Sequence, residues 1–226
     1  MERGSRFCEN AGPAVFFYAA VNAAKNGNCS AGLRTCCADR NTCEGTEQLR
    51  ISLEDNMEIL VCVKQVPDDS VEIALDPKTG APALDGVTPV VNAFDTYALE
   101  MAVRLKEAAG GEVTVLSIGD ESVKNSLKNC LAVGADYAYL AADDAYQNAD
   151  PEVIAKELQA AKAEIEEKTG KKFDIVFCGK ETTDFASGQV GTILAKELDV
   201  PVTADIVDIT AGEGKVTAKQ ETEEGY

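Results

Sequence analysis

The chain has neither histidine nor tryptophan among its 226 residues. Without an imidazole, Ser-His-Asp and Cys-His catalysis are excluded, as is every zinc site that uses histidine ligands. Basic residues are also scarce: 21 Lys and Arg stand against 39 Asp and Glu, giving a formal net charge of -18. Because affinity for nucleic acid comes from clustered Lys and Arg, we expect no nucleic-acid partner.

The composition changes at Met57. Residues 1–56 hold five of the eight cysteines but only 7 of the 39 acidic residues, so nearly all of the net negative charge lies in residues 57–226. This difference in composition suggests that residues 1–56 and residues 57–226 have different origins. We therefore divide the chain into a non-native or disordered extension, residues 1–56, and a nucleotide-binding α/β domain, residues 57–226.

Three interpretations of residues 1–56 remain. Arg3 and Arg6 before the apolar run 14–24 imitate a signal peptide, which would imply export and a small disulfide-bonded or metal-bound module. A second interpretation is a real but dispensable extension. We favour a third, in which translation starts at Met57, because codons for residues 53–55 can contain a ribosome-binding sequence.

From Met57 onward, short apolar runs alternate with amphipathic stretches, which is typical of a parallel sheet with helical crossovers. Residues 71–91 are interrupted by proline and glycine and predict a hairpin-like excursion. No run is long and apolar enough to insert directly into a membrane. The predicted strands are 58–64, 112–118, 137–141, 173–178 and 202–209, and the predicted helices are 95–109, 120–133, 150–168 and a last one ending at Leu198.

A doubly wound sheet with strand order 3-2-1-4-5 would place a ligand crevice between its first and fourth strands. The loop after the fourth strand, residues 179–191, reads GKETTDFASGQVG and leads into a predicted helix. Its glycines allow close backbone approach, and a helix N-terminus can hold phosphate. An ordinary polar loop with helix-capping residues explains the pattern equally well. Neither a G-x-G-x-x-G fingerprint nor a Walker P-loop is present.

Several motifs together resemble the β subunit of electron transfer flavoproteins. They occur in the family's order and extend over essentially all of residues 57–226, and Met57 falls where family members begin. The motifs are Val61-Cys62-Val63-Lys64-Gln65-Val66-Pro67, Asn92-Ala93-Phe94-Asp95, VTVLSIG at 113–119, AVGAD at 132–136 and the loop 179–191.

The resemblance implies a flavodoxin-like α/β subunit that is cytoplasmic and pairs with an electron transfer flavoprotein α subunit. Such a subunit binds FAD or AMP and passes electrons between a donor, NADH or an acyl-CoA dehydrogenase, and an acceptor. Because a bound flavin carries the redox chemistry, no catalytic side chain and no metal ligand are expected. By position, the cofactor pocket would comprise Cys62, Asn92, Ala93, Phe94, Asp95, Ile118, Gly179, Lys180, Thr182, Asp184, Ser187, Gly188, Gln189 and Val190.

Within this pocket, the backbone amides of residues 187–190 would hold phosphate, helped by the Ser187 hydroxyl and the Gln189 amide, while Asn92 would contact the adenosine end. Structural roles compete with each of these assignments. Core packing would also explain Cys62 and Ile118. Loop or helix capping would explain Asn92, Asp95 and Asp184, and Lys180 could be a solvated charge.

The chain also departs from the family pattern. Ala93 stands where members usually have proline, and residues 185–188 replace the common centre of the phosphate loop, which leaves FAD and AMP open with FAD favoured. The sequence stops at Tyr226 inside a predicted hairpin, so we expect the family's C-terminal arm to be missing from a truncated product.

Two other classes of protein share parts of this pattern. A universal-stress-type module would have the same architecture and would bind ATP as a homodimer without flavin. An ATP pyrophosphatase would need a Ser-Gly-Gly-x-Asp-Ser-type loop after the first strand, and residues 64–69 have nothing similar.

Overall fold

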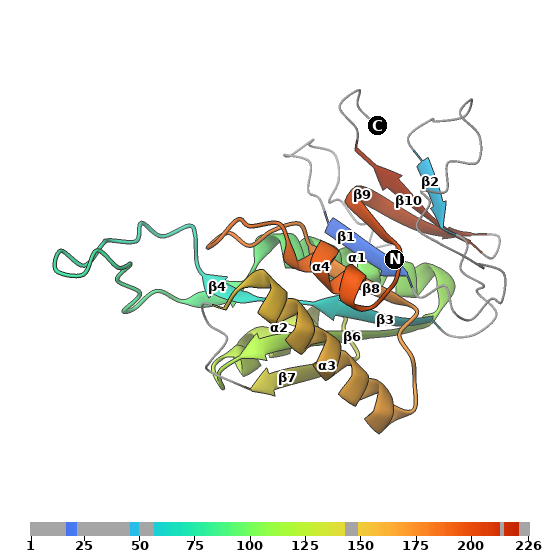
Figure 1. Ribbon diagram of the computed structural model, residues 1–226, viewed down its shortest axis with the longest axis horizontal. Helices are drawn as coiled ribbons and strands as arrows, with labels where there is room; N and C mark the ends of the chain where they lie inside the picture. The colour runs from blue at the N-terminus through green and yellow to red at the C-terminus, as the bar shows by residue number, and fades with distance from the viewer. Residues whose placement is uncertain (1–16, 22–45, 50–56, 143–148, 213–214, 222–226) are drawn as a thin grey trace, which may run out of the picture.

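The computed structural model describes residues 17–21, 46–49, 57–142, 149–212 and 215–221. Its centre is a set of four parallel strands in the order β7-β6-β3-β8 (Figure 1). Four helices follow these strands or separate them along the chain. The strands are β3 (Met57–Cys62), β6 (Gly111–Gly119), β7 (Tyr137–Ala142) and β8 (Ile175–Gly179), and the helices are α1 (Ala93–Ala109), α2 (Val123–Val133), α3 (Pro151–Thr169) and α4 (Val190–Glu197).

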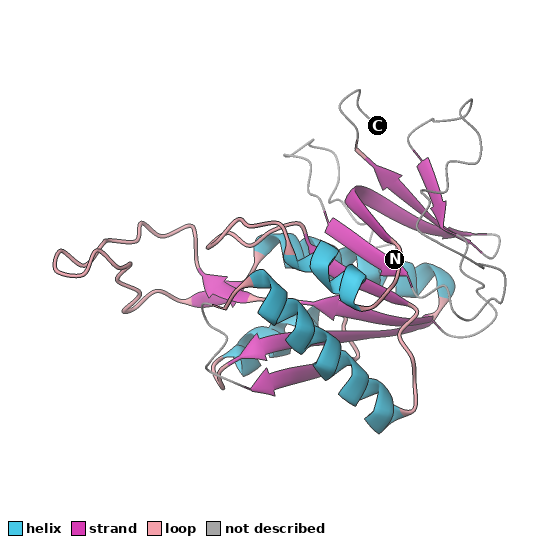
Figure 2. Ribbon diagram, in the orientation of Figure 1, coloured by secondary structure: helices cyan, strands magenta, loops and turns pink. Residues whose placement is uncertain are grey.

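Helices cover both faces of this parallel sheet, as Figure 2 shows. Side chains of β3 alternate between the two faces, and both faces are apolar. Ile59 and Val61 pack in one cluster with residues of α1 and α2, whereas Leu60 and Cys62 pack in a second cluster with residues of α3 and α4. The predicted α/β class with a parallel sheet is therefore confirmed.

The helix boundaries follow local capping chemistry. Asp150 accepts a hydrogen bond from the Glu152 amide at 2.9 Å and Pro151 opens α3, as predicted, while Gly170 ends it in the left-handed conformation with φ of 70°. Helix α2 begins later than expected. Asp120 accepts from the Ser122 amide at 2.7 Å in a local turn, and the helix starts at Val123.

The fifth predicted strand lies farther out than expected. It is found as β9 (Val202–Gly212) and forms a hairpin with β10 (Lys215–Gln220), but β1 (Phe17–Val21) lies between β9 and β8 and pairs antiparallel with both. The five predicted strands are β3, β6, β7, β8 and β9 in chain order. The first four are arranged in the predicted order 3-2-1-4, whereas β1 occupies the place predicted for β9. Strand pairing between segments so far apart leaves no local periodicity from which it could be predicted.

Strand β2 (Thr46–Leu49) pairs antiparallel with β10 and completes an eight-stranded sheet. Both β1 and β2 belong to residues 1–56, which are predicted to be a non-native or disordered extension. That division of the chain stays a prediction. Among the described residues, none of the helices has the length and apolarity that a membrane span needs.

The predicted excursion forms a projecting arm, residues 68–88, which extends away from the body of the molecule in Figure 1. Its base is a small two-stranded sheet of β4 (Gln65–Pro67) and β5 (Pro89–Val91). Farther out, Leu75 and Pro82 form a single antiparallel bridge. Strand β4 begins directly after Lys64 and β5 ends directly before Asn92, so the base of the arm adjoins the carboxyl end of β3.

Candidate functional site

Three chain segments meet where the parallel strands β3 and β8 end. They are Lys64, the start of α1 at Asn92–Asp95, and the loop from Gly179 into α4, and we call this set of residues the strand-end site. Asp95 joins the first and third segments. Its carboxylate accepts hydrogen bonds from the Lys64 amide at 2.7 Å and from the Gly179 amide at 3.1 Å. One buried side chain thus ties together the carboxyl ends of two neighbouring strands.

Burial has a large effect on Asp95, which is only 5% exposed. Desolvation raises the pKa of this carboxyl from 3.8 to about 7, although hydrogen bonds from Lys64, Asn92 and Gly179 act in the opposite direction. Asp95 also packs closely against the backbone of Gly179. A Cβ atom at Gly179 would lie 2.2 Å from the Asp95 Oδ1 atom, so the strand can end this close to Asp95 only with glycine.

Asn92 holds the base of the loop. Its side chain is fully buried, donating from Nδ2 to the Glu181 carbonyl at 2.9 Å and accepting at Oδ1 from the Thr183 amide at 3.2 Å. Its backbone amide donates to the Lys64 carbonyl at 2.9 Å. The polar groups of Asn92 are therefore hydrogen-bonded to the protein's own backbone. This agrees with the alternative in which Asn92 stabilises the loop and does not contact a ligand directly.

The loop between Gly179 and α4 turns sharply and is largely exposed. The Thr182 carbonyl accepts from the Ala186 amide at 2.7 Å, and Ala186 and Gly188 have positive φ angles of 49° and 60°. Gln189 then occupies the cap position of α4 without a capping bond from its side chain. Because the first amides of a helix have no partner within the helix, they can donate to an anion.

The strand-end site carries two cations, and each has a carboxylate partner. Lys64 Nζ lies 2.6 Å from Asp184 Oδ2 and 4.8 Å from the centroid of the Phe185 ring. Lys180 Nζ lies 3.0 Å from Asp205 Oδ1 in β9. Phe185 itself is 61% exposed. Ion pairs therefore connect the loop to Lys64, just after β3, and to Asp205 in β9.

The side chains beneath the strand-end site are apolar. Cys62 and Cys178 stand in register on adjacent parallel strands, and each is 7% exposed. A hydrogen bond that the Cys178 thiol donates to Cys62, together with burial, raises the pKa of Cys178 and keeps it neutral. Ile118 of β6 packs against the same cluster. Both Cys62 and Ile118 thus contribute to the core while they lie near the carboxyl edge of the sheet.

The structure brings most of the predicted pocket residues to one edge of the sheet. Asn92–Asp95 and the residues from Gly179 to Val190 meet there, with Cys62 below them, and Ile118 lies one strand away. Lys64 and Asp205 are absent from the predicted set. The position of Lys64 after the first apolar run could have indicated it, but Asp205 lies in a strand whose place depends on long-range pairing.

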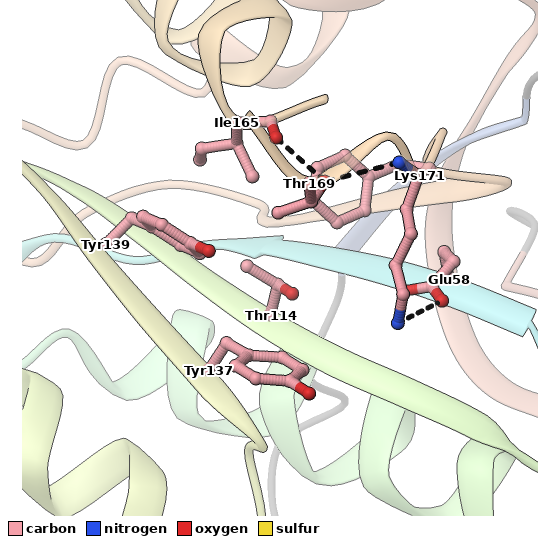
Figure 3. Close-up of a pocket in the computed structure, with 8 residues that line it drawn as sticks. Glu58, Thr114, Tyr137, Tyr139, Ile165, Thr169 and Lys171 are labelled. Carbon is pink, nitrogen blue, oxygen red and sulfur yellow. Dashed lines mark hydrogen bonds and ion pairs between the residues drawn. The ribbon is translucent and has the colours of Figure 1, made fainter. Parts of the chain in front are cut away.

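A separate hollow lies at the amino ends of the strands, opposite the strand-end site (Figure 3). It has a volume of about 270 Å³. Lys171 forms ion pairs at its border with Glu58, at 2.9 Å, and with Glu112. Within the described ranges, no group of acidic or cysteine side chains is arranged to hold a metal ion. The hollow is lined by Glu58, Thr114, Tyr137, Tyr139, Ile165, Thr169, Lys171 and Phe173.

A parallel α/β sheet with a polar loop and a helix N-terminus at its carboxyl edge is one of the architectures that bind nucleotides. The model of the electron transfer flavoprotein domain matches residues 83–226, and the chain belongs to that family. It is 42% identical over 172 residues to the electron transfer flavoprotein subunit beta of Megasphaera elsdenii and 38% identical over 170 residues to that of Thermoanaerobacterium thermosaccharolyticum.

A third relative is the caffeyl-CoA reductase-Etf complex subunit CarD of Acetobacterium woodii, which is 39% identical over 171 residues. Each of these three matches covers 75% of this chain and 63% of the relative. The chain thus spans a little under two thirds of the length of these relatives. The recognition made from the sequence motifs is confirmed at the level of the family.

Proposed function

We propose that the chain is the β-type, electron-carrying subunit of an electron transfer flavoprotein and pairs with a larger α subunit. It would act in the cytoplasm and pass electrons between a donor, NADH or an acyl-CoA dehydrogenase, and an acceptor. The observation that carries the proposal is the meeting of β3, β8 and the loop into α4 at one edge of a sheet in this family. The subunit names of the relatives support the same role.

The strand-end site suits the phosphate of FAD or AMP. The amides of residues 187–190 precede and begin α4, and the exposed side chains of Ser187 and Gln189 can add hydrogen bonds. Phe94, which is half-buried, and the exposed Ala93 would lie toward the adenosine end. Asn92 and Asp95 would act indirectly by fixing the backbone at Lys64, Gly179 and Glu181.

When bound, a flavin would supply the electron transfer, and the residues of this chain would bind and orient it. The buried thiol of Cys178 and the aliphatic side chain of Ile118 exclude water beneath the site. We favour FAD over AMP as the nucleotide of this subunit. The remaining predicted residues, Cys62, Lys180, Thr182, Asp184, Gly188 and Val190, are proposed to border the nucleotide.

Co-expression with the α-subunit gene of the same genome tests the proposal. The purified complex is analysed for subunit composition by gel filtration and for released nucleotides by chromatography. A yellow heterodimer with two flavins is the expected result, and one flavin with one AMP would keep the subunit role but replace FAD in this chain. A colourless homodimer that binds ATP would overturn the proposal in favour of a universal-stress-type module.

A further inference from the structure

Lys64 lies between β3 and β4 and forms an ion pair with the loop into α4. Its ammonium group lies 2.6 Å from the Asp184 carboxylate and 4.8 Å from the Phe185 ring centroid. The side chain of Lys64 is 37% exposed and that of Asp184 is 22% exposed. The pair is thus partly in contact with solvent.

The backbone of Lys64 is fixed independently of this ion pair. Its amide donates to Asp95 and its carbonyl accepts from the Asn92 amide at 2.9 Å. The turn that carries Asp184 is likewise fixed, since the Thr182 carbonyl accepts from the amides of Phe185 and Ala186. Separating Lys64 from Asp184 therefore needs only rotation of two side chains and leaves the backbone of the site in place.

The expected interaction energies favour the separation of Lys64 from Asp184 when a phosphate is bound nearby. An exposed ion pair contributes about 0 to 1 kcal/mol. A hydrogen bond from an ammonium group to a phosphate oxygen is charge-assisted, and the terminal phosphate of AMP, the ligand used in the test below, carries more negative charge than a carboxylate. Asp184 would also repel a phosphate bound at the adjacent amides of residues 187–190.

We propose that Lys64 exchanges the Asp184 carboxylate for a phosphate oxygen of the bound nucleotide, so that Asp184 competes with the ligand for Lys64. The inference rests on the proposed function. In this proposal Lys64 binds the phosphate, and Asp184 pairs with Lys64 when no nucleotide is bound. Phe185 keeps the ammonium group near the loop in both arrangements.

Two substitutions at the pair should then have opposite effects on AMP binding. Asp184→Asn removes the competitor and should lower the Kd for AMP by roughly two- to fivefold. Lys64→Met removes the phosphate ligand and should raise the Kd by at least about tenfold. In the Lys64→Met background, Asp184→Asn should no longer improve binding through a freed ammonium group, so the gain should shrink or vanish.

Isothermal calorimetry of the nucleotide-stripped chain with AMP measures these effects, and adenosine serves as the ligand that lacks the phosphate. Neither substitution should change the Kd for adenosine. Glu121→Gln is the matched control, because it makes the same change in charge at an exposed ion pair with Lys124 outside the site. Far-UV circular dichroism of each variant verifies that it is folded.

The outcomes separate the two proposals. If the wild-type chain binds AMP but Asp184→Asn weakens binding, Asp184 contacts the nucleotide directly and the exchange is wrong. An equal gain from Asp184→Asn with and without Lys64 would also overturn the exchange, because the effect would then be general repulsion. If the wild-type chain binds neither AMP nor FAD, alone or with the α subunit, the proposed function itself falls.

Discussion

Gly179 leaves no room for a side chain beside Asp95. Gly179→Ala would place a Cβ atom 2.2 Å from the Asp95 Oδ1 atom and 2.9 Å from the Asp95 amide nitrogen. Since neither the carboxylate nor the backbone can move without breaking the bonds at the ends of β3 and β8, we expect a loss of about 1–3 kcal/mol in the free energy of unfolding. Urea denaturation measures it.

Gly212→Ala is the matched control for this substitution. Gly212 lies in β9, and a Cβ atom there would meet nothing within 4 Å. We therefore expect a change of less than about 0.5 kcal/mol. Equal losses for the two variants would contradict the steric explanation at Gly179.

Asp95 should also give the protein a characteristic pH dependence. In the folded state its carboxyl keeps a proton up to about pH 7, whereas an unperturbed aspartate releases it near 3.8. Between these values the unfolded state binds fewer protons, so the stability contributed by neutral Asp95 is present below the window and falls as the pH rises through it.

Asp95→Asn removes this titration but places an amide donor opposite a backbone amide, and it should destabilise the protein. The difference in unfolding free energy between wild type and variant should shrink as the pH rises from about 4.5 to 7.5. Urea titrations across this range measure the difference. A difference that stays constant or widens would show that Asp95 does not titrate in the window.

At the scale of residues, the sequence predicted location better than role. Asn92 and Asp95 were predicted to lie in one pocket with the loop 179–191, and they do meet that loop at the strand-end site, while nucleotide binding there stays a prediction. Their main contacts, however, are with backbone groups of β3, β8 and the following loop. Sequence spacing can show that two polar residues end at one edge of a sheet, but not whether their hydrogen bonds are already used by the chain.

Among the elements, the projecting arm contributes no side chain to either hydrophobic cluster of the described residues. Residues 68–88 contain the exposed side chains Val71, Leu75 and Leu84. Replacing residues 69–87 with Asn-Gly would leave a two-residue turn between Asp68 and Thr88, which continue the pairing of β4 and β5 through a hydrogen bond from the Asp68 amide to the Thr88 carbonyl. We expect a change in unfolding free energy within about 1 kcal/mol, because loop length alone has a small effect.

Thermal and urea unfolding of the shortened protein tests this expectation. Val66→Ala at the base of the arm is the comparison, since Val66 is only 2% exposed and its truncation should cost about 1–3 kcal/mol. A shortened protein that is less stable than Val66→Ala would show that the arm packs more firmly than its exposure indicates.

The elements after Met57 were largely predictable because each has its own local signal. Apolar runs bounded by turns gave β3, β6, β7 and β8, and the Asp150-Pro151 pair gave the start of α3. The position of β9 was not predictable. It depends on whether β8 pairs with β9 or with β1, and backbone hydrogen bonds between distant strands leave no mark on hydrophobic periodicity.

For the whole molecule, the segment after Met57 contains a complete set of packed layers. Its four parallel strands are covered by helices on both faces, and their side chains form two hydrophobic clusters. We therefore expect the segment 57–226 to fold by itself, with β9 free to pair with β8 once β1 is removed. This outcome would agree with our division of the chain at Met57.

Thermal unfolding of residues 57–226, compared with the full chain by circular dichroism, measures the contribution of the first 56 residues. We expect cooperative unfolding with a Tm within a few degrees of the full chain. A segment that aggregates or unfolds without a transition would show that β1 is needed to cover the edges of β8 and β9.

The arm also determines how the polypeptide could be divided. Strand β3 lies in the middle of the parallel sheet, yet the chain that leaves its carboxyl end passes through the exposed arm before it reaches α1 (Figure 1). A cut beside Lys78, inside the arm, would leave β3 on one fragment and its neighbours β6 and β8 on the other. The two fragments would then be natural halves of a split reporter whose reassembly rebuilds the centre of the sheet and the strand-end site together.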